Sequence, residues 1–251
     1  MGIVIRQSAK ASIVTYLGTA IGTFNVIFLY NQFLSQAQVG LIAGALISIP
    51  LIFASFTQLG IPHIAVRFFP HFDDPAKGHN GFFGFLMIAP LFGLSLFVIG
   101  YLSLHEVFNQ IYSENSPLLP TYFYYMIPLT ASYLYMTVLE AYARVHLRIV
   151  VPAIIRELFL RISNCLLILS FGMGYLDFHQ LIQCITLSYL VAVFGFLIYI
   201  KQLKRFYTRL DFSFLRQPIF KEMLGYGGWV LLAGASFTLI QHIEKLMLPA
   251  Y

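Results

Sequence analysis

Two long apolar runs near the amino terminus constrain the fold of this chain more than any other feature. Residues 11–34 and 39–59 contain no charged side chain, and only the uncharged residues 35–38 separate them. Each run can form a helix of about 20 residues, enough to cross a bilayer, and four residues suffice for a turn between adjacent helices. Basic residues precede and follow the pair. The pattern predicts a transmembrane hairpin with both ends in the cytoplasm.

Paired glycines mark one surface on each of these helices. Gly18 and Gly22 lie four residues apart in the first run, and Gly40 and Gly44 do so in the second. In lipid, where apolarity does not drive helices together, such spacing lets two backbones approach closely. We therefore expect close backbone packing within the hairpin.

The composition and apolar segments of the whole chain predict an all-α polytopic membrane protein. Its 251 residues are 59% hydrophobic and 10% charged, whereas soluble domains carry about 25% charged residues. The first run is too long for the apolar region of a cleavable signal peptide and lacks a cleavage site. Five further apolar segments bring the expected number of transmembrane helices to seven. These segments are residues 81–104, 117–139, 151–171, 178–200 and 225–248.

The basic residues predict the orientation. Twelve of the fifteen Lys and Arg residues fall in segments 1–10, 61–80, 141–150 and 201–224, and the three segments expected on the opposite side carry none. This bias places the amino terminus in the cytoplasm. It also accounts for the net charge of +5 without a nucleic-acid partner. Segment 201–224, which mixes basic and aromatic residues, is expected to lie on the membrane surface and contact anionic lipid.

Several short motifs resemble a transporter family. They are Gln7-Ser8-Ala9-Lys10, Gln38-Val39-Gly40, the stretch 60–68, and Ile243-Glu244-Lys245-Leu246-Met247-Leu248. Together with the order of spans and loop charges over the whole chain, they resemble the Wzx-like polysaccharide flippases of the MATE/MOP exporter superfamily. Glu244 stands where that family more often has Asp, and Pro249 where it has Gly.

This resemblance implies a fold of two six-helix lobes around a central cavity. Residues 1–200 would form the amino-terminal lobe, 201–224 a cytoplasmic amphipathic connector, and 225–251 the first helix of a truncated second lobe. The missing carboxyl-terminal lobe of the same chain is then an expected partner, and the bacterial inner membrane is the expected location.

The implied function is transport of undecaprenyl-pyrophosphate-linked oligosaccharide across the inner membrane by alternating access, without enzymatic activity or a cofactor. A cation-coupled multidrug antiporter of the same superfamily is the first alternative. A membrane assembly subunit that transports nothing is the second. A glycan polymerase or ligase would usually have a large external loop, which the expected topology does not provide.

The fifth expected span contains the densest charged group, Arg156, Glu157 and Arg161. Each charge within a span costs at least about 2.5–3.5 kcal/mol, so such residues usually face a cavity or a partner. Glu157 precedes Arg161 by four residues, the favourable order for an ion pair on a helix. The arginines either reach the inner interface, or they line a cavity and bind pyrophosphate oxygens bidentately.

Other residues extend the candidate substrate site. Arg67 and His63 share one helical face if the second span continues past Pro62. They act there either as an anchor at the membrane interface or as a phosphate contact at the cavity mouth. Asn25 lies on a polar side of the first span and either bonds between helices or contacts sugar hydroxyls. Glu140 and Arg144, at the inner end of the fourth span, form either a local ion pair or part of the same mouth.

Coupling and metal chemistry are the remaining questions. Glu244, beside Lys245, forms a structural pair or couples transport to H+ or Na+, and Glu157 is the second coupling candidate. Cys165 and Cys184 lie inside apolar spans without metal-ligand spacing and are expected to be packing residues. The sequence contains no Gly-rich phosphate loop, no nucleophile with a spaced base and no His/Cys metal cluster, so neither an enzyme nor a metal site is expected.

Overall fold

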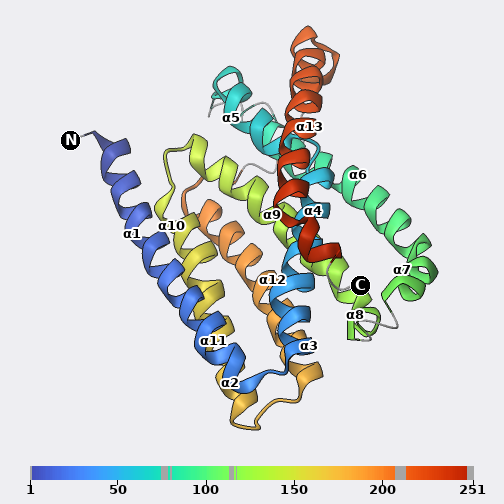
Figure 1. Cartoon of the computed structure of the whole chain (residues 1–251). Coiled ribbons are helices and arrows are strands. Elements are labelled where there is room, and N and C mark those ends of the chain that lie inside the picture. The colour runs from blue at the N-terminus through green and yellow to red at the C-terminus, as the bar shows by residue number, and fades with distance from the viewer. Residues whose placement is uncertain are drawn as a thin grey trace.

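The computed structural model is a bundle of helices (Figure 1). It describes residues 2–74, 79, 81–112, 116, 118–206 and 213–247, with the side chains of 3, 4, 243 and 245–247 left out. Within these ranges every regular element is a helix, as the sequence predicts.

The elements follow one another in short connections, and several long helices contain a π-helical segment. The first helix consists of α1 (Ile3–Phe24), η1 (Asn25–Tyr30) and α2 (Asn31–Phe33), and the second of α3 (Gln36–Val39), η2 (Gly40–Ala45) and α4 (Leu46–Thr57). Then come α5 (Ile61–Phe72), α6 (Phe82–Ser103), α7 (His105–Tyr112), α8 (Leu118–Thr121), η4 (Phe123–Tyr125) and α9 (Met126–Val145). The remainder is α10 (Val150–Ala153), η5 (Ile154–Phe159), α11 (Leu160–Gly172), α12 (Phe178–Gln202), η6 (Ser213–Arg216) and α13 (Pro218–Met247).

Among the described residues, five helices are long and apolar enough to cross a membrane. They are Ile5–Phe33, Gln36–Thr57, Phe82–Ser103, Phe178–Gln202 and Pro218–His242. The other two expected spans also form helices, namely α9 and the continuous α10, η5 and α11. These two are more polar because they carry the charged residues of the bundle interior. The fold is therefore all-helical and compatible with a multi-pass membrane protein.

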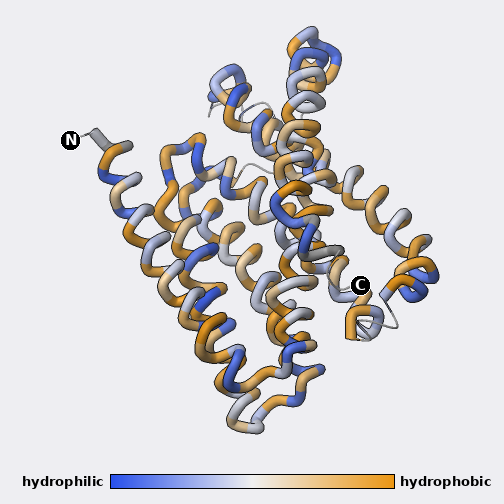
Figure 2. The backbone as a smooth tube through the Cα atoms, viewed as in Figure 1, coloured by the Kyte–Doolittle hydropathy of each residue, from blue (hydrophilic) through white to orange (hydrophobic). Residues whose placement is uncertain are grey.

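Helix α9 forms the centre of the bundle and packs against α4, α5, α6 and α12 (Figure 1). Its side chains at Leu134, Leu139 and Tyr142 are fully buried. By contrast, large apolar side chains on peripheral helices point outward, with Tyr16 and Trp229 each 77% exposed. Figure 2 shows hydrophilic residues concentrated near turns and helix ends. Apolar surfaces outside and charges within are the distribution that a bilayer favours.

A break between α4 and α5 shows that the second span does not continue past Pro62 as one helix, although His63 and Arg67 still share the exposed side of α5. Leu59 and Gly60 have φ of 52° and 69°, the left-handed conformation that ends a helix. A side chain at Gly60 would also collide with the backbone of Gly227 in α13. Helix α5 therefore starts anew and buries Ile64 and Phe68 while its polar residues face outward.

Two element boundaries also differ from the sequence prediction. Helix α13 begins at Pro218, earlier than the expected 225, because the segment assigned to the connector already packs its apolar residues on the bundle. The predicted outer loop after α6 contains the amphipathic helix α7. Residues 207–212 of the connector lie outside the described ranges, as do Pro249 and the side chain of Lys245.

The paired glycines do not hold the hairpin together. A Cβ atom at Gly18 would lie 2.6 Å from the Glu157 carbonyl oxygen, and one at Gly22 would lie 2.6 Å from Nη1 of Arg161. Thus the first pair packs on η5 and α11, not on the second helix. Cβ atoms at Gly40 and Gly44 would meet no described atom within 4 Å. The expected packing surface on α1 is present, but the prediction of its partner was wrong.

We expect Gly18→Ala to destabilise the protein by about 1–3 kcal/mol, because the added methyl group overpacks the α1–η5 contact. Gly40→Ala is the matched control, also a glycine within a helix but with open space around it. It should be neutral or slightly stabilising, since alanine is the better helix former. Thermal unfolding in detergent micelles measures both, and equal effects of the two substitutions would contradict the assigned packing.

A half-buried histidine, His146, lies among aromatic rings just after the end of α9. The ring centroids of Phe69 and Tyr142 lie 4.9 and 4.8 Å from that of His146. The pKa of His146 is lowered to about 4, chiefly by burial and then by the positive charge of Arg205 and the neighbouring His79, against an opposite effect of Asp73. Burial likewise lowers the pKa of His79. Both rings are therefore neutral in the folded protein at pH 7.

Stability should consequently fall in acid. An unfolded histidine binds a proton near pH 6.5, whereas folded His146 does so only near pH 4. Between these values the unfolded chain binds more protons, so stability is complete above about pH 6.5 and declines toward pH 4. Melting temperatures at pH 7.5 and 5 should differ less for His146→Gln than for the unmodified protein. His71→Gln, on the exposed side of α5, should retain the full difference; a full difference in His146→Gln as well would refute this assignment.

Candidate functional site: a polar cavity inside the bundle

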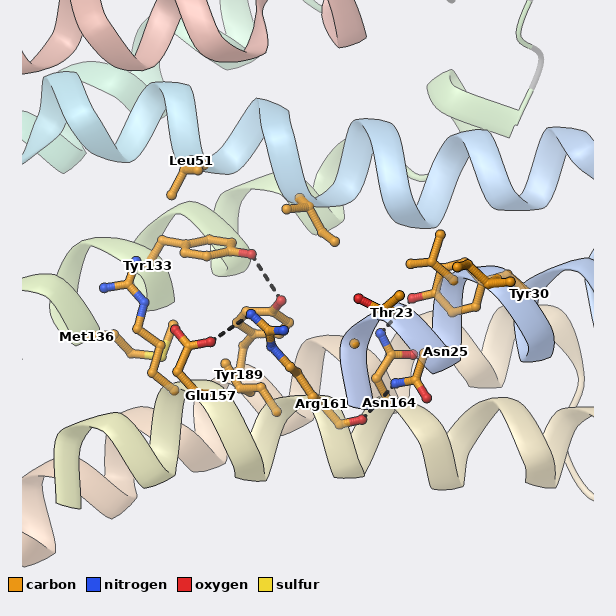
Figure 3. Close-up of a pocket in the computed structure, with 16 residues that line it drawn as sticks. Thr23, Asn25, Tyr30, Leu51, Tyr133, Met136, Glu157, Arg161, Asn164 and Tyr189 are labelled. Carbon is orange, nitrogen blue, oxygen red and sulfur yellow. Dashed lines mark hydrogen bonds and ion pairs between the residues drawn. The ribbon is translucent and has the colours of Figure 1, made fainter. Parts of the chain in front are cut away.

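A cavity of about 610 Å³ lies inside the bundle between α1 and η1, α4, α9, η5 and α11, and α12 (Figure 3). Leu51, Met136 and Leu160 contribute apolar walls. Nine polar side chains share the lining: Thr23, Asn25, Tyr30, Tyr133, Arg156, Glu157, Arg161, Asn164 and Tyr189. Its volume is in the range of sites that bind small molecules.

Two π-helical segments, η1 and η5, line this cavity; η1 packs on α11, and η5 packs on α1. Asn25 begins η1, and its Nδ2 atom donates a hydrogen bond of 2.9 Å to the backbone oxygen of Arg161, directly after η5. Such segments disturb the regular helix and often occur at functional sites. Here they accompany a direct link between the first helix and the fifth expected span. Asn25 is 3% exposed, so the sequence prediction placed it correctly on an interior face.

The expected ion pair within η5 and α11 is present. Arg161 Nη2 lies 2.6 Å from Glu157 Oε2, as the four-residue spacing predicts. Arg161 Nη1 also donates a hydrogen bond of 2.8 Å to the Gly18 carbonyl oxygen. One guanidinium therefore neutralises a carboxylate on its own helix and holds the backbone of α1. This arrangement requires glycine in α1, because a side chain at Gly18 or Gly22 would occupy the space of the pair.

Arg156 belongs to a second ion pair, with Glu140 of α9. Its Nη1 lies 2.7 Å from Glu140 Oε2, while Arg144 Nη2 lies 2.9 Å from Oε1 of the same carboxylate. The predicted local pair of Glu140 and Arg144 is thus confirmed and has an additional member. Arg156 and Arg161 both line the cavity, which is one of the two placements that the sequence left open. Each guanidinium, however, already binds a carboxylate. A phosphate group would have to replace these partners.

The other end of the cavity is uncharged and holds unused hydrogen-bonding groups. Asn164 Nδ2 donates to the Tyr30 hydroxyl at 2.8 Å. The hydroxyls of Tyr133 and Tyr189, 3.0 Å apart, lie instead toward the charged end, beside Glu157 and Arg161 (Figure 3). The Oδ1 atoms of Asn25 and Asn164 are buried and have no hydrogen-bond partner among the described residues. A buried carbonyl oxygen without a donor is unfavourable by about 1–3 kcal/mol. These two oxygens therefore favour a ligand that brings N–H or O–H groups.

The sequence interpretation did not include Asn164 or the three tyrosines. Asn164 follows Glu157 and Arg161 by seven and three residues, so the helical period alone places all three on one face. Tyr133 and Tyr189 gave no such signal, since aromatic residues are frequent throughout this chain. Only the packing of α9 against α12 brings their hydroxyls together.

Three predicted site residues lie elsewhere. Arg67 and His63 project from the exposed side of α5; Arg67 lies 4.0 Å from Glu222 Oε1 and 4.3 Å from the ring centroid of Tyr226. These contacts join α5 to α13, and neither residue lines the cavity. Glu244 is exposed near the end of α13, away from the cavity lining. The helix break at Gly60 explains why Arg67 and His63 do not reach the cavity, because it turns α5 away from the axis of α4.

No metal centre is found in the part of the chain that the structure describes, where no three His, Cys, Asp or Glu side chains lie close enough to share an ion. Cys165 and Cys184 are free thiols, both partly buried.

Comparison with known proteins gives no family for this chain: no family model, no curated protein and no solved structure matches it. Functional inference therefore rests on the cavity together with the sequence motifs described above.

Arg161→Lys should destabilise the protein by about 1–3 kcal/mol. A single ammonium group cannot reproduce the planar contact with both the Glu157 carboxylate and the Gly18 carbonyl oxygen. Arg67→Lys is the control, because an exposed pair at 4.0 Å contributes little and lysine retains the contact with the Tyr226 ring. Its melting temperature in detergent should stay near that of the unmodified protein, whereas equal losses would refute a structural role specific to Arg161.

Proposed function

We propose that this chain forms the amino-terminal part of a membrane transporter, and that the polar cavity binds the head group of a polyprenyl-pyrophosphate-linked oligosaccharide. In this proposal the chain has seven spans with its amino terminus in the cytoplasm of a bacterial inner membrane. A second lobe, of which α13 is the first helix, would complete a MATE/MOP-type arrangement. The sequence resemblance supplies the family, and the cavity supplies the reason for a sugar-bearing substrate.

The buried amide oxygens of Asn25 and Asn164 carry this proposal. Sugar hydroxyls and N-acetyl groups offer the O–H and N–H donors that these oxygens lack. Tyrosine side chains add hydroxyls that donate or accept and aromatic faces that contact the apolar side of a sugar ring. The uncharged end of the cavity is thus complementary to a polar, neutral ligand.

The charged end of the cavity suits a phosphate group only after an exchange of partners. At rest Arg156 and Arg161 neutralise Glu140 and Glu157, so the arginines do not stand unpaired in a low-dielectric interior. A pyrophosphate that displaced a carboxylate would receive the bidentate hydrogen bonds that guanidinium provides. A coupling ion that released Glu157 from Arg161 would make the arginine available, which is how coupling to H+ or Na+ would enter this mechanism.

A cation-coupled antiporter remains the second candidate because of Glu157. A carboxylate inside the bundle, 22% exposed in its side chain and lining a cavity, is a group that an organic cation would seek. In this structure Arg161 occupies that position, which favours the oligosaccharide. A membrane assembly subunit would not need the buried amide oxygens.

Binding to the purified chain in lipid nanodiscs tests the proposal. Asn164→Leu should weaken binding of a polyprenyl-pyrophosphate oligosaccharide about tenfold, the loss of one hydrogen bond of about 1.4 kcal/mol. Binding of the same lipid without its sugar should be unchanged. Asn31→Leu is the control, because Asn31 is exposed and bonds only to the Ile27 carbonyl oxygen of its own helix.

Each other outcome argues against the proposal. Equal affinity for the lipid with and without its sugar would show that the cavity does not recognise the oligosaccharide. Tighter binding of an organic cation, lost in Glu157→Gln, would support the antiporter. Binding of neither ligand would favour the assembly subunit.

A further inference from the structure

A second cavity lies beside the first along the same helix contact. It has a volume of about 450 Å³ and is lined by Gln7 and Thr15 of α1, Glu140 and Arg144 of α9, and Pro152 of α10. Basic residues cluster at this end of the bundle, which the loop charges predict to face the cytoplasm. Within the described residues, the buried Gln7 Oε1 atom has no hydrogen-bond partner. This cavity is no part of the sugar site described above.

One carboxylate stands between the two cavities. Glu140 lines the second cavity, and its two oxygens bind one arginine in each: Arg144 in the second, at 2.9 Å, and Arg156 in the first, at 2.7 Å. The side chain of Arg144 is 57% exposed, while that of Arg156 is 37% exposed. The wall between the cavities is therefore an arginine–glutamate–arginine triad, and an ion pair is a contact that a competing anion can replace.

Helix α1 lines both cavities with one face. Gln7, Ala11 and Thr15 line the second cavity and Gly22 the first, while Gly18 lies between them against Glu157. These positions follow one another at three- and four-residue steps, which keeps them on one side of a helix. Between the two cavities Gly18 packs closely on the backbone of Glu157, so α1 and η5 leave no space there. The ion pair of Glu140 with Arg156 is the side-chain contact that joins the linings of the two cavities.

We propose that the second cavity is the entrance chamber of the polar cavity and that the Glu140–Arg156 ion pair is the closed barrier between them. The inference rests on the proposed function, because it assigns the chamber to the phosphate-bearing end of the substrate. A prenyl phosphate or pyrophosphate binds first to the exposed Arg144. It then replaces Glu140 as the partner of Arg156, which breaks the link between α9 and η5 and joins the two cavities.

The accessibility of a cysteine inside the polar cavity tests the barrier without any substrate. Met136 lines that cavity and is 1% exposed, so Met136→Cys, in a background with Cys165→Ser and Cys184→Ser, reports water access from outside. Vesicles containing the protein are treated with a membrane-impermeant methanethiosulfonate reagent. Glu140→Gln should increase the rate of modification about tenfold, equivalent to weakening the closed state by about 1.4 kcal/mol.

A double-mutant comparison makes the test specific to the pair. Arg156→Gln alone should increase the rate as Glu140→Gln does, and the two together should add little, because both remove the same contact. Glu222→Gln breaks an arginine contact outside both cavities and should leave the rate unchanged. If Glu140→Gln does not fold, Glu140→Asp is the substitute. It keeps the negative charge on a shorter side chain, so it should increase the modification rate by a smaller factor.

An unchanged rate in Glu140→Gln, or single effects that multiply in the double variant, would overturn the barrier. Farnesyl pyrophosphate probes the chamber itself: Arg144→Gln should weaken its binding about tenfold, whereas Arg148→Gln, an exposed arginine outside both cavity linings, should not. Equal losses would indicate general surface charge and overturn the chamber assignment. The accessibility results do not depend on sugar recognition, so they distinguish failure of this inference from failure of the proposed function.

Discussion

The ion pair of Arg161 with Glu157 is the interaction on which the arrangement around α1 depends. A charged side chain inside a bundle of apolar helices must find a partner, since the cost of leaving it unpaired exceeds that of most packing defects. Arg161 satisfies this requirement twice, through Glu157 on its own helix and through the Gly18 carbonyl oxygen on α1. The two glycines then follow as a steric necessity, because the pair fills the space that side chains at Gly18 and Gly22 would take.

Pairing of opposite charges also determines the character of the cavity. Arg156 and Arg161, which line the cavity, each have a carboxylate partner in Glu140 and Glu157, so these charges offset one another. Arg144, the third arginine in these ion pairs, is exposed. Hydrogen-bonding capacity is left over at the uncharged end, at Asn25 and Asn164. A substrate with a neutral polar part and an anionic part would meet both regions. Its neutral part binds unused groups, whereas its anionic part competes for arginines that are already engaged.

Residue spacing in the sequence located surfaces better than it located their partners. The helical period placed Glu157 and Arg161 together, and it identified Gly18 and Gly22 as a close-packing surface. The partner assigned to those glycines was wrong because a neighbour in sequence need not be the neighbour in space: α1 packs on η5, α10 and α11, whereas α4 packs on α9. For Arg67 and His63 the sequence left open an interfacial anchor or a contact at the cavity mouth. They lie outside the cavity lining because the left-handed residues Leu59 and Gly60 end α4 and redirect the chain.

By itself the sequence determined that this protein is helical, that several of its helices suit a membrane, and that charges of opposite sign lie on one face of the fifth expected span. These properties follow from composition and period, which act within each helix. The tertiary structure alone decided which helices enclose the cavity, that Arg156 pairs with Glu140 of another helix, and that Tyr133 meets Tyr189. Such contacts join residues far apart in the chain, and their geometry depends on how whole helices pack, which no local pattern encodes.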